Sequence, residues 1–343
     1  MIKATAPGKI IIFGEHAVVY DKLGIAAAID LRVSCKIDKS KEITVENIGI
    51  FKSTANDIRN VNIHMGTLIE KKDFPTVASI LRDDPNICTK YVISQVMKKA
   101  SPIRRSASAS DRPRPFSMKN HSPLRKGMGG SAAIFSAEAK ALSKFLGVNL
   151  SKKEISDIAY SGDVIAHGGT PSGIDNSTVT YGGYVAFKKS RGPEHLKIKS
   201  MLPLVIGDTK MPASTAQTVS MVRNLVEKGD KKVIQAIDDI EHISEQAIES
   251  IKAGDLIRVG KLMDENQKKL RVLQVSSPEL ERLIEAAKAA GAYGAKLSGS
   301  GGGGIMIAVC DKKNQQAVAD AINRAGGEAI ITQVGAEGVR IEK

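Results

Sequence analysis

The chain has 343 residues, of which 42% are hydrophobic and 4% aromatic, and it carries a formal net charge of +13. A domain usually takes roughly 100–200 residues, so this length predicts two domains. No apolar run approaches the ~20 residues that a membrane helix needs. The charge favours an anionic partner, either a nucleotide or a nucleic acid, but the absence of tryptophan makes base-stacking surfaces scarce.

Two apolar runs near the N-terminus predict buried strands. The run Ile10–Phe13 lies between the turn signals Pro7-Gly8 and Gly14, and a second run begins at Ile25 and leads into an alternating segment. These turn signals also interrupt the N-terminus before a signal peptide could form.

Helical patterns begin clearly after Ser131. Apolar residues recur on one face over 134–145, and Gly147 follows in the position of a helix C-cap. The Ser151–Glu154 segment has the pattern of a capping box, which predicts that a second helix begins there.

The second half of the chain is predicted to be mostly helical from Ser214 to Ala290. A strand, a glycine turn and another strand follow over Gly294–Val309, then a helix over 315–324 and a last strand over 328–334. The polar segment Lys188–Pro193 places a domain boundary near 190–200, which predicts domains 1–195 and 196–343.

An irregular basic stretch covers residues 98–122. From Lys98 to Lys126 the only acidic residue is Asp111, and prolines exclude a helix or a central strand over 112–115. Two interpretations are open, a solvated or disordered insert and a nucleic-acid-binding arm. We expect Arg104–Met118 to be mobile and exposed, with no strand.

The strongest local signal is the glycine-rich run Gly127–Ala133, directly before the helix that starts at Ile134. Free backbone N–H groups and the positive end of a helix dipole both suit a phosphate, and the Ser131 hydroxyl is placed to bind Mg²⁺. The alternative is a tight turn at the start of a helix. The run is not a Walker A loop, because no Gly-Lys-Ser/Thr follows the glycines.

Three further segments carry groups that could react or bind. Lys9, Glu15 and His16 flank a buried strand, where they form one pocket or are merely a solvated lysine and a structural histidine. Asp175 stands in a glycine-framed loop, either as a catalytic carboxylate or as a turn or N-cap residue. The four glycines 301–304 indicate a backbone in close contact with a ligand or another loop.

In order and spacing, these four segments resemble the GHMP kinases, the superfamily of galactokinase, homoserine kinase, mevalonate kinase and phosphomevalonate kinase. The segment 123–133 matches the phosphate loop of that superfamily, and Gly14–Tyr20 and Pro171–Asn176 are similar to the mevalonate kinases in particular. The resemblance covers residues 2 to about 334 and weakens from about 40 to 122. It implies an α+β fold, with an N-terminal domain like ribosomal protein S5 domain 2 and a C-terminal ferredoxin-like domain.

The resemblance implies ATP-dependent phosphorylation of mevalonate to 5-phosphomevalonate, a step in isoprenoid precursor biosynthesis. Asp175 would be the general base, and Lys9 would lower the pKa of the C5 hydroxyl. The implied ATP-binding residues are Arg125, Lys126, Gly127, Met128, Gly129, Gly130, Ser131, Ala132 and Ala133. The implied substrate-binding residues are Lys9, Glu15, His16, Asp175 and Thr215. The implied Mg²⁺ ligands are Ser131 and Asp163.

The sequence departs from the family pattern at several positions. Asp163 stands where a longer glutamate is usual, and Ala213 stands where many members have an arginine, for which Lys210 is a candidate substitute. The strand that leads into the phosphate loop in the family is not recognisable at 101–122, which is either an insertion or a local sequence error.

The expected partners are ATP and mevalonate, with Mg²⁺ as cofactor and with neither a specific nucleic acid nor a membrane; whether the chain forms a homodimer is open. Cys35, Cys88 and Cys310 have no disulfide or metal-ligand spacing, which predicts a cytoplasmic protein. The alternative functions are another small-molecule GHMP kinase, such as a phosphomevalonate kinase or a sugar kinase, and, more distantly, an S5-like nucleic-acid-binding protein.

Overall fold

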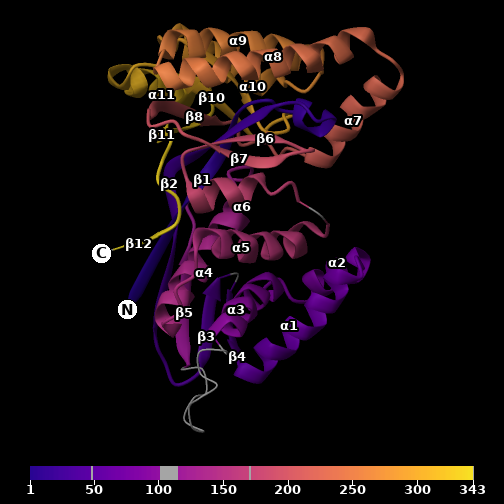
Figure 1. The fold of residues 1–343 in the computed structure, drawn as a ribbon. Coiled ribbons are helices and arrows are strands. Elements are labelled where there is room, and N and C mark those ends of the chain that lie inside the picture. Colours follow the sequence, from indigo (N-terminus) through magenta and orange to yellow (C-terminus); the bar gives the residue numbers. More distant parts are fainter. Residues whose placement is uncertain (48, 101–114, 170, 343) are drawn as a thin grey trace.

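The two longest strands, β1 (Ile2–Phe13) and β2 (Gly24–Lys39), form an antiparallel pair that runs through the middle of the molecule (Figure 1). The structure is a computed structural model that describes residues 1–47, 49–100, 115–169 and 171–342. The sequence predicted a turn at Pro7-Gly8, but both residues lie inside β1, at a shift in register with β2. A bulge tolerates proline because it leaves the chain locally without a ladder hydrogen bond.

Within the described residues the strands form one 12-stranded sheet, which extends from the β1–β2 pair in two directions. One arm, beside β2, consists of β5 (Phe116–His121), β3 (Ile43–Asn47) and β4 (Gly49–Ser53). The other arm consists of β11 (Glu328–Val334), β8 (Leu202–Asp208), β10 (Ile305–Val309) and β9 (Gly294–Ser298). The hairpin of β6 (Tyr184–Lys188) and β7 (Gly192–Leu196) pairs with β2, and β12 (Arg340–Ile341) pairs with β1.

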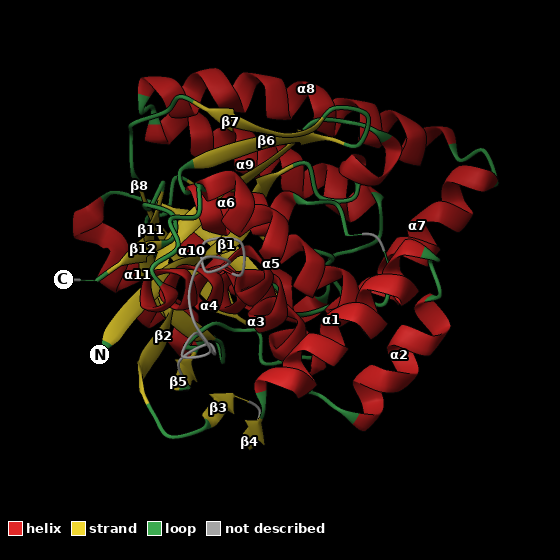
Figure 2. Cartoon of the chain, turned by 60° about the horizontal axis from the view of Figure 1, so that its bottom comes forward, coloured by secondary structure: helices red, strands yellow, loops and turns green. Residues whose placement is uncertain are grey.

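The helices form two groups, one against each arm of the sheet (Figures 1 and 2). The first group is α1 (Ala55–Glu70), α2 (Phe74–Asp83), α3 (Ile87–Ala100), α4 (Gly130–Leu146), α5 (Lys152–His167) and α6 (Ile174–Tyr181). The second group is α7 (Thr215–Glu227), α8 (Lys231–Ala253), α9 (Leu256–Val272), α10 (Pro278–Ala289) and α11 (Gln315–Arg324). The described residues also include the short 3₁₀ helices η1 (Ala17–Tyr20) and η3 (Lys312–Asn314).

The end of β1 that carries Lys9 lies between the two groups of helices. Its residues Ile10, Ile12 and Phe13 are fully buried, and they belong to the same core cluster as Leu204 of β8 and Leu262 of α9. The first residues of β1 pack instead into the core of α1–α5. β1 therefore packs into the cores of both halves of the molecule, which together fix the strand that carries Lys9.

After residue 130 the predicted helices and strands are present, but α6, β6, β7, β8 and β12 were not predicted. α4 ends at Gly147 in the left-handed conformation, and α5 begins with the capping box of Ser151 and Glu154. α10 begins at Pro278, and β9, β10, β11 and α11 lie where they were predicted. The predicted domain boundary falls on the β6–β7 hairpin, within a sheet that continues through both predicted domains.

Residues 104–118 were expected to be mobile and exposed with no strand, and for residues 116–118 this expectation was wrong. Phe116–His121 is a strand that pairs antiparallel with β2 and parallel with β3. Phe116 and Met118 are buried while Ser117 and Lys119 are not, and this alternation gives the short segment a core face. The strand before the phosphate loop is therefore present. The earlier part, residues 101–114, lies outside the described residues.

The sequence showed clear helical patterns only after Ser131, so α1, α2 and α3, which all precede it, were not predicted. α1 starts with a capping box in which Thr54 accepts from the backbone of Asp57 and the Asp57 carboxylate accepts from the backbone of Thr54. Among the described residues, no helix is both long enough and apolar enough to cross a membrane.

Candidate active site

A cleft of about 790 Å³ opens where the two halves of the chain meet. Its walls come from β1, the turn before η1, the loop before α4, the start of α6 and α7, and the turn between β9 and β10. Those of its lining residues that carry polar or charged side chains are Lys9, Glu15, His16, Lys126, Ser131, His167, Asp175, Asp208, Lys210, Thr215, Ser298 and Ser300.

Lys9 and Asp175 form an ion pair at the floor of this cleft, with 3.1 Å between Nζ and Oδ1. The Lys9 side chain is only 10% exposed, and that of Asp175 is 33% exposed. Asp175 lies in the first turn of α6, and the N-cap is Gly173. Asp175 is therefore not an N-cap residue, and Lys9 is not a solvated surface charge.

The glycine-rich loop rests directly on this ion pair. The backbone N–H of Lys9 donates to the carbonyl of Met128 (2.9 Å), which fixes the loop against β1. Gly129 has a φ of +69°, and a Cβ there would lie 2.8 Å from Cγ of Lys9 and 3.6 Å from Oδ2 of Asp175. Only glycine allows this conformation and this close approach together.

The loop ends at the N-terminus of α4 without a capping side chain. The N-cap residue is Gly129, so the first-turn N–H groups receive no acceptor from it. Gly127, Gly129, Gly130 and Ser131 line the cleft next to these groups. Unpaired amides at a helix N-terminus form a site for an anionic oxygen such as that of a phosphate.

The other predicted loop residues occupy different environments. Met128, Ala132 and Ala133 are completely buried, so their side chains pack beneath the loop and only their backbones are near the cleft. Lys126 lines the cleft and donates to the carbonyl of Ala213 (3.2 Å). The guanidinium of Arg125 is paired with Glu328, away from the lining residues of the cleft.

Ser131 and Asp163 form a second pair beside the loop. The Ser131 hydroxyl donates to Oδ1 of Asp163 (2.8 Å), and Asp163 is 1% exposed. Burial, together with the negative charge of nearby Asp175, raises the pKa of Asp163 to about 6. His167 holds the same turn of α5 through a 2.9 Å hydrogen bond between Nδ1 and the backbone carbonyl of Asp163.

His16 and Thr215 line another part of the cleft, and both contact Ser300. Nε2 of His16 lies 2.8 Å from the carbonyl of Ser300, and because a carbonyl can only accept, Nε2 is the protonated nitrogen. Burial lowers the pKa of His16, which favours the neutral ring with Nδ1 free to accept. Thr215 donates to the hydroxyl of the same Ser300 (3.2 Å).

Glu15 differs from the other predicted substrate-binding residues. It contributes to the cleft wall, but its carboxylate is paired with Lys296 at 2.5 Å, and the two side chains are 1% and 0% exposed. Lys296 was not among the residues predicted from the sequence, and neither were the cleft residues Ser298 and Ser300. All three lie in the segment 294–304, for which the glycines had predicted only a close backbone contact.

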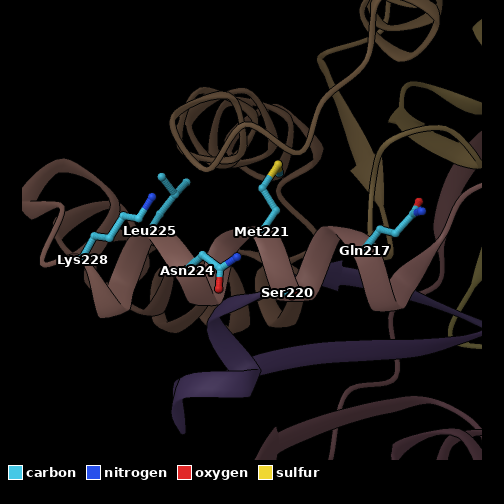
Figure 3. A pocket seen from close by; sticks show the side chains of 6 residues that line it. All are labelled: Gln217, Ser220, Met221, Asn224, Leu225 and Lys228. Carbon is cyan, nitrogen blue, oxygen red and sulfur yellow. The ribbon is translucent and has the colours of Figure 1, made fainter.

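A separate hollow of about 590 Å³ follows one side of α7 (Figure 3). It is lined by Gln217, Ser220, Met221, Asn224, Leu225 and Lys228. These residues include no carboxylate, histidine or cysteine, so the hollow lacks a carboxylate and ammonium pair like that of Asp175 and Lys9. The cleft at Lys9 and Asp175 is the better candidate for an active site.

Two family models match the chain. The model described as the GHMP kinases N terminal domain matches residues 90–183, which include the glycine-rich loop and Asp175. The model described as GHMP kinases C terminal matches residues 247–328, which include β9 and β10.

Curated relatives match over the whole chain. The mevalonate kinase of Pyrococcus furiosus is 35% identical, over 99% of this chain and 98% of the relative. That of Thermococcus gammatolerans is also 35% identical, over 100% of this chain and 98% of the relative.

Solved structures show the same fold. The Methanococcus jannaschii mevalonate kinase has a TM-score of 0.76 at 25% identity and covers 97% of this chain and 98% of its own. The L. major mevalonate kinase, solved in complex with R-mevalonate, has a TM-score of 0.73 at 26% identity, over 98% and 96% of the two chains.

Proposed function

This chain belongs to the mevalonate kinase family of the GHMP kinases, and we propose that it transfers the γ-phosphoryl group of ATP to the C5 hydroxyl of mevalonate. The observation that carries the proposal is the ion pair of buried Lys9 and half-buried Asp175, against which Gly129 of the phosphate loop packs. A carboxylate and an ammonium at 3.1 Å, next to a phosphate site, are the groups that such a transfer requires.

Asp175 accepts the proton of the C5 hydroxyl as the oxygen attacks the γ-phosphorus. The new O–P bond forms while the bond to the β-phosphate oxygen breaks, and ADP leaves with that electron pair. The ammonium of Lys9 stabilises the negative charge that develops on the attacking oxygen. Because both side chains are held within the walls of the cleft, little reorganisation is needed during the reaction.

The phosphates of ATP bind at the N-terminus of α4. The amides of Gly127, Gly129, Gly130 and Ser131 donate to the phosphate oxygens, and the ammonium of Lys126 lines the same cleft. Lys210 also lines the cleft and adds a further positive charge.

Ser131 and Asp163 are the residues that fit Mg²⁺. Both offer oxygen ligands, and Mg²⁺ typically takes one or two carboxylates together with substrate phosphates rather than an all-protein cage. A bound ion would neutralise charge on the β- and γ-phosphates.

Mevalonate would lie between the Lys9–Asp175 pair and the wall formed by His16 and Thr215. The neutral His16 ring can accept a hydrogen bond at Nδ1, and the Thr215 hydroxyl lies on the same wall.

A cytoplasmic location is supported by Cys35, Cys88 and Cys310, which are all free and buried.

The test is Asp175→Asn, assayed for ADP release with mevalonate, phosphomevalonate and galactose as substrates. Loss of a positioned general base typically lowers kcat by ~10²–10⁴-fold, with ATP binding by calorimetry little changed. The matched control is Asp157→Asn on α5, a carboxylate that is 61% exposed and is expected to leave kcat unaltered.

Two outcomes would contradict the proposal. Near-normal kcat in Asp175→Asn would make this carboxylate structural. Turnover of phosphomevalonate or galactose, with none of mevalonate, would assign the chain to another small-molecule kinase activity.

A further inference from the structure

Three residues at alternate positions of β9 and the turn after it each bind the end of β1 or the turn that follows it. Lys296 donates to the Glu15 carboxylate (2.5 Å), and Ser298 donates to the carbonyl of Ile11 (2.7 Å). The carbonyl of Ser300 accepts from Nε2 of His16 (2.8 Å). Lys296 and Ser298 alternate along β9, so their side chains face the same side of the strand, and the backbone carbonyl of Ser300 in the following turn extends this row of polar groups.

The turn that this row holds has an unfavourable backbone. His16 has a φ of 61° and a ψ of −41°, which is uncommon for a residue with a Cβ. Gly14, two residues earlier, has a φ of 93°, and a Cβ there would lie 2.4 Å from Cα of Gly24. Such conformations persist only where the surroundings fix them, and they gather at functional sites.

The ion pair of Lys296 and Glu15 is the buried part of the contacts that hold this turn in place. Besides Glu15, the Lys296 ammonium donates to the carbonyl of Leu297 (2.6 Å), and the second Glu15 oxygen accepts from Asn266 (3.4 Å). A fully buried ion pair is often no more stabilising than apolar residues of the same size, because both charges are desolvated. Its hydrogen bonds do fix the orientation of both side chains.

We propose that Lys296 is a positioning residue for phosphoryl transfer, which acts through Glu15 to hold His16 in the substrate wall of the cleft. This inference depends on the proposed function, since it assigns His16 to the mevalonate side. Lys296 itself does not line the cleft, so it acts without touching the substrate.

The experiment is a double-mutant cycle of Glu15→Gln, Lys296→Met and the double variant, with KM and kcat measured for both substrates. Because the pair acts as one unit, the double variant is expected to lose no more than the worse single variant. We expect the KM for mevalonate to rise 10–100-fold in each, with kcat reduced less than threefold and the KM for ATP changed less than twofold. Lys296→Arg, which can still pair with Glu15, is expected to recover most of the lost affinity for mevalonate.

The matched control is Lys269→Met on α9, which removes a half-buried ion pair with Asp239 outside the cleft and should alter neither KM. If Lys296→Met does not fold, the double variant, which buries no unpaired charge, still tests the idea. Additive losses, an unchanged KM for mevalonate or an equal rise in both KM values would overturn the inference. Absence of mevalonate turnover in the unmodified protein would instead overturn the proposed function.

Discussion

Glu138 is a buried carboxyl that the proposed mechanism does not use, and replacing it by glutamine should stabilise the protein at alkaline pH. It lies on α4 with no exposed surface, and Oε1 accepts from Thr89 (3.0 Å) and Asn120 (2.6 Å). Within the described residues, Oε2 has no hydrogen-bond partner. Burial raises the pKa of Glu138 from 4.5 to about 7, and the two hydrogen bonds only partly oppose this effect.

The sign and size of this stability change follow from the linkage between proton binding and folding. Because the folded pKa is the higher one, the stability contribution of Glu138 is fully present below pH 4.5 and is lost as pH rises to about 7. One unit of pKa shift corresponds to about 1.4 kcal/mol, so the loss at pH 8 is about 3 kcal/mol. Glutamine has no charge to bury and keeps an acceptor oxygen for both donors.

Thermal unfolding of the two proteins between pH 5 and pH 8 measures this difference. A chain of this length gains an unfolding entropy of roughly 0.7 kcal/mol/K, so Glu138→Gln should raise Tm by about 4 °C at pH 8 and by about 1 °C at pH 5. The control is Glu285→Gln, an exposed position on α10 where the Tm difference should not depend on pH. The reasoning is refuted if Glu138→Gln changes Tm equally at both pH values, or if it lowers Tm at pH 8.

Two further changes test the phosphate loop. Gly129→Ala forces a Cβ against Lys9 and strains a φ of +69°, so kcat should fall at least tenfold, whereas Gly147→Ala has a similar φ with open space around it and should leave kcat unchanged in the same assay. Arg125→Ala breaks a half-exposed pair with Glu328 and should cost less than about 1 kcal/mol in denaturant unfolding, with the KM for ATP changed less than threefold. A tenfold rise in that KM would make Arg125 a nucleotide contact.

The parts of the fold that were predictable carry strong local signals. α4 and α5 each have an apolar face and a terminal glycine in the left-handed conformation, and α5 also has a capping box, all of which are visible in a short window of sequence. β5 has only six residues and follows an arginine- and proline-rich stretch, so its alternation of Phe116 and Met118 was obscured. Pro7-Gly8 has the composition of a turn, and only the register against β2 shows that it is a bulge.

The candidate site was predictable where one short motif contains both a reactive or binding group and the glycines that shape the backbone around it. The glycines of the phosphate loop and Asp175 were identified in this way, and the structure places them in one cleft. Lys296 was missed because a lysine in a strand normally faces solvent, and its burial depends on Glu15, which is 281 residues away in the sequence. Long-range pairs of this kind leave no local pattern.

The pairing of β12 with β1 has a consequence for biosynthesis. Ala4 is opposite Ile341 and Thr5 is opposite Arg340, and the backbone N–H of Glu342 donates to Lys3 (2.8 Å), so the two termini lie side by side (Figure 1). A ribosome adds about 5–20 residues per second, so β1 leaves it roughly 20–70 s before its partner strand exists. During that interval one edge of the strand that carries Lys9 is open to other chains. Circular permutants that join the present ends and open an exposed loop elsewhere would make these two strands consecutive and shorten that exposure.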